Sequence, residues 1–252
     1  MEKTKLQMML AFHKPGTVSL AVSLEKLGIS HGLQKRYRNS GWLESIGSGA
    51  MKRPDDIIQW SGGVYALQTQ ADLLIHPGAM TAIARQGHSH YLRFGREQVF
   101  LFSPPRTNLP AWFQQYDWMV PIQHILTSIL PPTLGLNVYE EKMFTIQIAS
   151  LERAMLECLY LAPETLDLVE CFQVMEGLVN LRPTLVQELL LACTSVKVKR
   201  LFLYLAEKAN HQWLAFLDIS KLDLGSGDRS LVAGGVYVSK YQLVVPETLA
   251  AL

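Results

Sequence analysis

Cysteine is scarce in this sequence, and apolar runs of membrane-spanning length are missing. The three cysteines, Cys158, Cys171 and Cys193, lie far apart, and none has the CxxC spacing of a metal or redox site. No apolar stretch reaches the roughly 18 to 20 residues of a membrane-spanning helix, and the first residues lack the apolar core of a secretory signal. These absences argue against a disulfide scaffold and against a chain that spans a membrane. We expect a cytoplasmic protein with reduced, buried thiols.

The sequence also lacks the usual catalytic and metal-binding motifs. It has no Gly-x-Ser-x-Gly elbow and no cysteine with an assignable histidine partner. His88 and His90 would point to opposite sides of a strand, and no carboxylate nearby completes a metal site. Asp218, Asp223 and Asp228 lie in a stretch with two glycines, but their spacing fits neither a Walker loop nor an EF-hand and predicts a turn. We therefore expect no enzyme, no metal and no cofactor.

Charge is distributed unevenly along the chain, although the whole chain carries only +1. Residues 1–53 hold nine basic and three acidic side chains, a net charge of +6, which leaves −5 on the remainder. A basic N-terminal fifth on a mildly acidic body predicts an anionic partner for that end. Composition alone leaves open whether this partner is DNA, RNA or a membrane surface.

The N-terminal segment has the pattern of a helix-turn-helix. Apolar residues at helical spacing predict one helix over residues 2–12 and a second over residues 19–27. Gly28, Ile29 and Ser30 follow: a glycine suited to the left-handed end of a helix, an apolar residue for the core, and a serine to cap the next helix. This three-residue joint leads into a third helix over residues 31–40.

The third predicted helix has one polar and one apolar face. The polar face holds His31, Gln34, Lys35 and Arg38. Leu33 and Tyr37 lie opposite and would pack on the first two helices. Such a helix can enter a major groove, with Lys35 and Arg38 on phosphates and His31 and Gln34 near base edges. An ordinary solvated face is the alternative.

The residues after this helix predict a wing. Residues 42–46 alternate like a half-buried strand, Gly47-Ser48-Gly49 forms a turn, and Lys52 and Arg53 would contact the DNA backbone from the hairpin. The order helix, turn, helix, hairpin is typical of a winged helix-turn-helix. Pro54 is then expected to open a fourth helix, with two aspartates in its first turn.

The predicted fold is α+β, with a winged helix-turn-helix domain over residues 1–70 and a larger mixed domain over residues 71–252. Strands are expected first, then helices, then a closing hairpin. The strands are 98–102, 123–128 and 143–149, the helices 150–161, 164–178, 182–194 and 196–209, and the hairpin joins 236–238 to 241–245. On the last helix Lys197, Lys199 and Arg200 form a basic cluster. It is either a solvated flank or a contact surface for a partner.

Segments along the whole chain resemble the AbiEi antitoxins of type IV toxin–antitoxin systems. They are residues 60–68 (WSGGVYALQ), 76–78 (HPG), 81–82 (TA), 86–88 (QGH), 109–113 (LPAWF), 150–157 (SLERAMLE), 181–183 (LRP) and 197–203 (KVKRLFL). Each segment is weak by itself, but together they occur in the right order over the whole chain.

This resemblance implies two activities. In that family a winged helix-turn-helix binds inverted repeats in its own promoter and represses the operon. The C-terminal domain counters a nucleotidyltransferase-like toxin without forming a stable complex with it. By position, DNA contact then falls on residues 31–38 and on Lys52 and Arg53, and the Lys197, Lys199 and Arg200 cluster is the candidate antitoxin surface. A stand-alone winged-helix transcription factor with a ligand-sensing C-terminal domain is the alternative.

Overall fold

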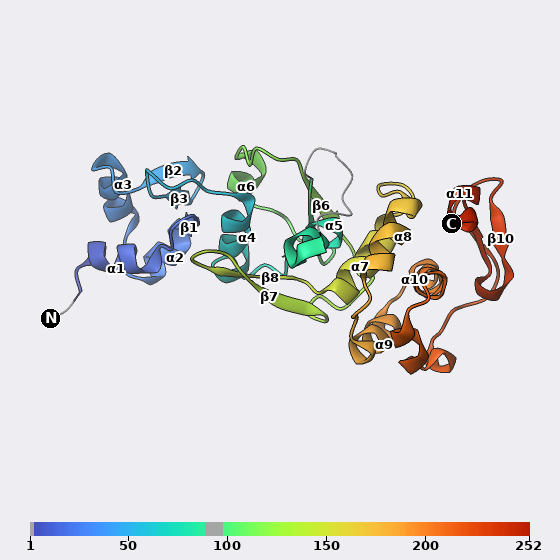
Figure 1. The fold of residues 1–252 in the computed structure, drawn as a ribbon. Helices are drawn as coiled ribbons and strands as arrows, with labels where there is room; N and C mark the ends of the chain where they lie inside the picture. Colours follow the sequence, from blue (N-terminus) through green and yellow to red (C-terminus); the bar gives the residue numbers. More distant parts are fainter. Residues whose placement is uncertain (1–2, 89–97) are drawn as a thin grey trace.

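Three hydrophobic clusters follow one another along an elongated molecule (Figure 1). The computed structural model describes residues 3–88 and 98–252. The first cluster lies in the N-terminal unit, the second in the middle of the molecule, and the third and largest among the C-terminal helices. Helices and strands alternate in the first two units, and helices dominate the third, so the predicted α+β class is confirmed.

The N-terminal unit consists of three short helices and a three-stranded sheet. Its elements are α1 (Lys5–Phe12), β1 (Ser19–Leu20), α2 (Ala21–Lys26), α3 (His31–Asn39), β2 (Glu44–Gly47) and β3 (Ala50–Lys52). The sheet order is β1-β3-β2, and all of its neighbouring strands are antiparallel. A helix-turn-helix followed by a hairpin that pairs back onto a strand before α2 is the topology of a winged helix.

The joint between α2 and α3 has the predicted structure. Gly28 has a φ of +75°, in the left-handed region that glycine tolerates. Ile29 is fully buried in the first cluster, and the Ser30 hydroxyl accepts a hydrogen bond from the Leu33 amide at the start of α3. Tyr37 is buried on the opposite side of α3, as its position in the pattern predicts.

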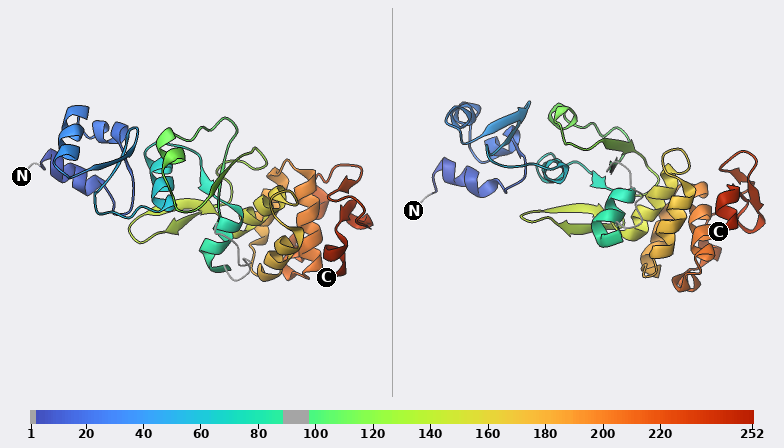
Figure 2. Two further views of the ribbon diagram at one scale, coloured as in Figure 1. Left: turned by 90° about the horizontal axis from the view of Figure 1, so that it is seen from above. Right: turned by 45° about the horizontal axis from the view of Figure 1, so that its top comes forward.

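The middle unit is built on one helix, a small mixed sheet and a hairpin. It contains α4 (Trp60–Thr69), β4 (His76–Pro77), α5 (Ala79–Ile83), a π turn (Ala84–His88), β5 (Val99–Ser103), α6 (Ala111–Gln115), β6 (Ile122–Leu126), β7 (Leu136–Glu140) and β8 (Thr145–Ala149). The sheet order is β4-β5-β6, with β5 parallel to β6 and antiparallel to β4. The β7–β8 hairpin extends beneath α4 toward the N-terminal unit (Figures 1 and 2).

The prediction of a helix that begins at Pro54 is wrong, because α4 begins only at Trp60. The carboxylate of Asp56 accepts hydrogen bonds from His13 Nε2 at 3.0 Å and from the amide of Gly16 at 3.2 Å. The carboxylate therefore ties residues 54–59 to the loop after α1. Asp56 stabilises a connection between the two units rather than the start of a helix.

The C-terminal unit is mainly helical and ends in a small sheet. Its elements are α7 (Leu151–Leu161), α8 (Leu168–Gly177), α9 (Pro183–Ala192), α10 (Val196–Lys208), the 3-10 turns Gln212–Phe216, Ile219–Lys221 and Ser239–Tyr241, β9 (Arg229–Ser230), β10 (Val236–Val238), β11 (Leu243–Val245) and α11 (Glu247–Ala251). The predicted closing hairpin is confirmed as β10–β11, and β9 joins it in parallel. Ser150, Asp167 and Ser195 cap three of the helices through their side chains.

The predicted boundary at residue 70 stays a prediction. Val18, Leu20 and Ala50 of the N-terminal unit belong to the same hydrophobic cluster as Trp60 and Val64 of α4. The winged helix and the middle unit therefore share a core. Among the helices of the described residues, none has the length and apolar character needed to cross a membrane.

Candidate nucleic-acid interface

The exposed side of α3 carries three of the predicted DNA-binding residues. His31, Lys35 and Arg38 are exposed, and Ser30 caps the N-terminus of the helix beside them. The His31 ring, 73% exposed, lies 3.1 Å from the carboxylate of Glu25. Figure 1 places α3 at the outer end of the molecule, opposite the C-terminus. This end is the one that carries the excess of positive charge.

Gln34 does not lie on this exposed face, so its predicted exposure is wrong. The residue is 1% exposed, and its amide nitrogen donates to the carbonyls of Ala21, at 3.1 Å, and Ile29, at 2.9 Å. These bonds connect α3 to the first residue of α2 and to Ile29 of the helix-turn-helix joint. Helical spacing assigned Gln34 to the polar face, but its long side chain folds back into the joint.

A groove separates α3 from the wing hairpin. Its cavity has a volume of about 290 Å³. It is lined by Ala21, His31, Gln34, Arg38, Ser45, Gly47, Ser48, Gly49, Ala50 and Met51. The Arg38 guanidinium lies over this groove, with Nη1 at 3.4 Å from the sulfur of Met51. Ser45 and Ser48 were missed by the sequence analysis, although the Gly47-Ser48-Gly49 turn marked their position.

Lys52 and Arg53 do not form the tip of the wing. The β2–β3 turn lies at Ser48 and Gly49, and Lys52 is the last residue of β3, at the base of the hairpin. Lys52 Nζ lies 3.4 Å from the carboxylate of Glu44 and donates to the carbonyls of Pro54 and Asp56. Lys52 is thus engaged in contacts within the protein, and its predicted contact with DNA stays a prediction. Arg53 follows it and is partly exposed.

The wing rests on the middle unit. A Cβ atom at Gly47 would lie 2.8 Å from Cβ and 3.0 Å from Cα of Trp112. Only glycine therefore allows the backbone of the wing to approach α6 this closely. Trp112 belongs to α6, is 3% exposed and packs in the second hydrophobic cluster. Its ring stands edge-on to those of Phe113 and Trp118. This aromatic support fixes the position of the wing relative to the rest of the molecule.

A buried histidine reinforces the same junction. The His13 ring bonds to the Ser19 hydroxyl through Nδ1 at 2.7 Å and to Asp56 through Nε2 at 3.0 Å. Burial lowers the pKa of His13, and the hydrogen bond and negative charge of Asp56 offset this only in part. Gly62 of α4 lies against the Gly16 carbonyl so closely that a Cβ atom would overlap it. The polar contacts and the tight packing join the winged helix to α4.

Two of the three side chains in the basic cluster on α10 are buried, so most of the cluster does not form a surface, and its antitoxin contact stays a prediction. Arg200 is 2% exposed and Lys199 is 5% exposed. Arg200 donates five hydrogen bonds to the loop after Leu224 and to Gln242. Lys197 Nζ donates to the carbonyls of Tyr160, at 3.4 Å, and Ala162, at 2.7 Å. Lys197 and Arg200 thus hold segments of the C-terminal unit together, and Lys199 is buried.

The remaining candidates from the sequence are the aspartate-containing turn and the histidine pair. The predicted turn with Asp218, Asp223 and Asp228 is the loop that encloses Arg200, through the carbonyls of Gly225 and Gly227. His90 and the side chain of His88 lie outside the described residues. Within residues 3–88 and 98–252, no three His, Cys, Asp or Glu side chains gather in the way metal ligands would.

Two models of known protein families match the chain. A model described as transcriptional regulator, AbiEi antitoxin N-terminal domain, matches residues 2–94. A second, described as transcriptional regulator, AbiEi antitoxin, type IV TA system, matches residues 96–246. The chain belongs to the AbiEi family. The resemblance seen in the sequence is thereby confirmed, and AbiEi membership makes the chain a transcriptional regulator and antitoxin of a type IV toxin–antitoxin system.

A solved structure shares the AbiEi chain's fold. The crystal structure of the RV2827C protein from Mycobacterium tuberculosis superposes with a TM-score of 0.57 at 14% sequence identity. The match covers 90% of this chain and 86% of that chain, so the two proteins share the arrangement of all three units. At this identity the likeness concerns the fold alone. No curated protein matches the chain.

Proposed function

We propose that the protein represses its own operon by binding repeated sites in the promoter through α3 and the wing groove. The observation that carries this proposal is the exposure of Lys35 and Arg38 on α3, beside a groove that the braced wing holds open. Two cations on a helix face can neutralise phosphates, and the groove gives the side chains a fixed register on the duplex. The N-terminal charge of +6 would draw DNA to this end.

We also propose that the remainder of the chain neutralises a nucleotidyltransferase-like toxin without a stable complex. Family membership supports this activity, and the three-unit arrangement supports a division of labour between the ends of the molecule. Lys199 and Arg200 are buried and Lys197 is half-buried and bonded to carbonyl groups, so we assign this activity to no particular surface. The proposed mode of action is that of a regulator and not of an enzyme.

Titration against duplex DNA tests the repressor. Full-length protein is titrated with the duplex upstream of its own gene and with a scrambled duplex, at several salt concentrations. The Lys35→Ala/Arg38→Ala variant should flatten the plot of log K against log salt by roughly two units, because two phosphate contacts are lost. The control is Lys221→Ala/Lys240→Ala, which removes the same charge from exposed side chains at the other end. Equal slopes for all three proteins would refute the α3 assignment.

Co-expression with the neighbouring toxin tests the second activity. Deleting residues 1–70 is a poor test, because it removes α4 and opens the second hydrophobic cluster to water. Lys35 and Arg38 are exposed, so we expect the Lys35→Ala/Arg38→Ala variant to fold and still to protect cells when its expression comes from an unrelated promoter. A stand-alone transcription factor would protect no cell in either form, which separates the two functions.

A further inference from the structure

One buried polar atom beside the wing groove has no hydrogen-bond partner. Within residues 3–88 and 98–252, the only buried side-chain oxygen or nitrogen without a partner is Oε1 of Gln34. Gln34 is 1% exposed and lines the groove of about 290 Å³ between α3 and the wing. A buried acceptor without a donor is costly and rare in folded proteins. The atom therefore points to a donor that a ligand brings into the groove.

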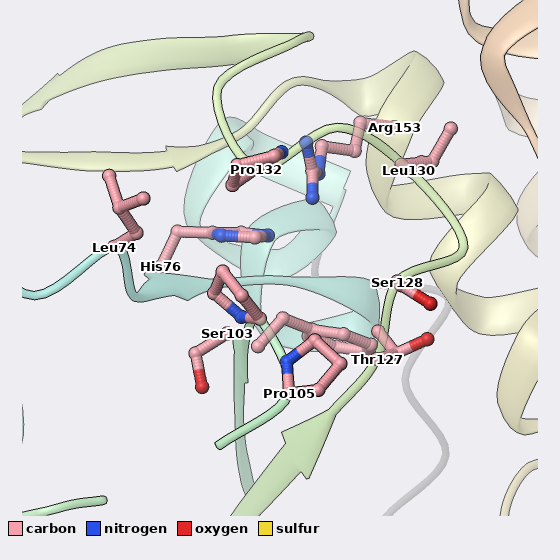
Figure 3. Close-up of a pocket in the computed structure, with 11 residues that line it drawn as sticks. Leu74, His76, Ser103, Pro105, Thr127, Ser128, Leu130, Pro132 and Arg153 are labelled. Atoms are coloured by element: carbon pink, nitrogen blue, oxygen red, sulfur yellow. The ribbon is translucent and has the colours of Figure 1, made fainter. Parts of the chain in front are cut away.

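The cavity drawn in Figure 3 carries no such signal. It has a volume of about 80 Å³ and lies where the middle unit meets the C-terminal helices. His76 Nε2 and Arg153 Nε, which belong to its walls, lie 2.8 Å and 2.7 Å from one carboxylate oxygen of Glu157. These side chains are bonded to one another within the protein. The wing groove is therefore the stronger candidate for a ligand.

The amide group of Gln34 is fixed through its nitrogen. Nε2 donates to the carbonyls of Ala21, at 3.1 Å, and Ile29, at 2.9 Å. An oxygen in the place of Nε2 would face two acceptors, so the two ends of the amide cannot be exchanged. Both N–H groups of Nε2 are engaged in these bonds. Gln34 can therefore offer a ligand only an acceptor, at Oε1.

The residues around the groove do not supply the missing donor. The wing lines the groove with residues 47–50, which are two glycines, a serine and an alanine, and these short side chains leave it open. Arg38 follows Gln34 by one helical turn and is exposed, and its Nη1 lies 3.4 Å from the sulfur of Met51. A group that enters from outside can thus approach Gln34 once the Arg38 side chain moves aside.

Duplex DNA has few donors for such an acceptor. Phosphate and deoxyribose groups within a duplex only accept hydrogen bonds, and the donors in the major groove are the exocyclic amino groups of adenine and cytosine. Guanine and thymine present acceptors at this edge. A glutamine whose whole amide is free donates and accepts, and it selects adenine. A glutamine that can only accept would instead distinguish amino bases from keto bases.

We propose that Gln34 contacts one base of the operator through Oε1 and selects adenine or cytosine over guanine and thymine. This inference rests on the proposed function, because it assigns a base preference to the same interface. Arg38 leaves the groove to bind a phosphate, and the amino group of the base then donates to Oε1. Gln34 keeps its bonds to the helix-turn-helix joint throughout, so the joint holds the acceptor in a fixed position.

Titration with substituted duplexes tests the proposal. Full-length protein is first titrated with the duplex upstream of its own gene, and each base pair of that duplex is then changed to the other three. At one position of each repeat, adenine and cytosine should bind alike, and guanine and thymine about tenfold more weakly. An adenine analogue that lacks only the amino group should also bind about tenfold more weakly there.

The outcomes separate this inference from the proposed function. No preference for the upstream duplex over a scrambled one would refute the proposed function, and the inference with it. A preference for the upstream duplex without any position of this kind would overturn the inference alone. Water or the DNA backbone would then occupy the groove.

Two variants show whether Gln34 makes the contact. Gln34→Lys keeps a donor for the carbonyls of Ala21 and Ile29 but has no acceptor, so the tenfold difference should fall below twofold. Glu25→Ala is the matched control and should keep the difference, because it removes an exposed carboxylate that lies 3.1 Å from His31. An unchanged difference in Gln34→Lys would overturn the proposal.

The duplexes decide if Gln34→Lys fails to fold. Equal binding of adenine and cytosine that persists in Glu25→Ala then supports an acceptor at Gln34. Selection of adenine alone, or loss of the difference in Glu25→Ala, overturns the proposal.

Discussion

Replacing Arg200 by methionine tests whether the α10 cluster is structural. The guanidinium donates to the carbonyls of Leu224 at 2.7 Å, Gly225 at 3.1 Å and Gly227 at 2.7 Å. It also donates to the carbonyl of Gln242 at 3.2 Å and to its side-chain oxygen at 2.9 Å. No salt bridge among the described residues includes Arg200, so these oxygens alone compensate its charge. Methionine fills a similar volume but satisfies none of them.

The magnitude follows from these five bonds. A hydrogen bond to a charged group contributes about 1.5–3 kcal/mol net. Five such terms would sum to the whole stability of a typical domain, about 5–15 kcal/mol. The simple sum overstates the effect, because burying the guanidinium itself costs several kcal/mol and the loop can open locally to water. We therefore expect Arg200→Met to lower the free energy of unfolding by about 3–5 kcal/mol.

Urea denaturation followed by circular dichroism measures this loss. Lys197→Met is the matched control, because Lys197 donates to only two carbonyls and is partly exposed, so we expect a loss of about 1 kcal/mol. A loss below 1 kcal/mol for Arg200→Met, or one no larger than that of the control, would refute the structural role. In that case a contact surface on α10 would have to be considered again.

Three further predictions concern the N-terminal half. Gly47→Ala should lower stability by about 1–3 kcal/mol, since its Cβ meets Trp112; Gly49→Ala, also at positive φ but with open space around it, should cost less in the same urea titration. Burial lowers the pKa of His13, so the unfolded chain binds more protons and stability falls as the pH drops below about 6.5. The fall between pH 7.5 and 5.5 should be smaller in His13→Asn, and an unchanged fall would contradict the assignment. Gln34→Leu should lower stability by about 1–3 kcal/mol, because two buried carbonyls lose their donor; unchanged stability with altered DNA sequence preference would show that Gln34 reads bases.

Local signals in the sequence predicted most of the helices. Gly28, Ile29 and Ser30 predicted the helix-turn-helix joint because each residue has a local role in turning, packing or capping. Helices α7 to α10 of the C-terminal unit were predicted because their apolar spacing and caps are local as well, whereas the short helix α11 was missed. The two-residue strand β4 and the strand β7 were missed, since their pairing depends on partners elsewhere in the chain.

The candidate site was predicted only in part, because periodicity assigns a face but not the direction of a long side chain. Lys35 and Arg38 are exposed as expected, whereas Gln34 turns inward to carbonyls that the pattern does not reveal. The burial of Arg200 could not be predicted either, because its hydrogen-bond partners Gly227 and Gln242 follow it by 27 and 42 positions in the sequence. Nothing in the local sequence distinguishes such a buried cation from a solvated one.

The shared core of the winged helix and the middle unit bears on how long the protein survives in the cell. Val18, Leu20 and Ala50 lie in the second hydrophobic cluster, so a fragment released by cleavage near residue 54 would expose apolar side chains and lose the support of its wing. We expect such a fragment to be degraded instead of accumulating as a partial repressor. Under the proposed function, proteolysis would then end repression and protection in the same event. The loss of one molecule would thereby permit synthesis of its replacement.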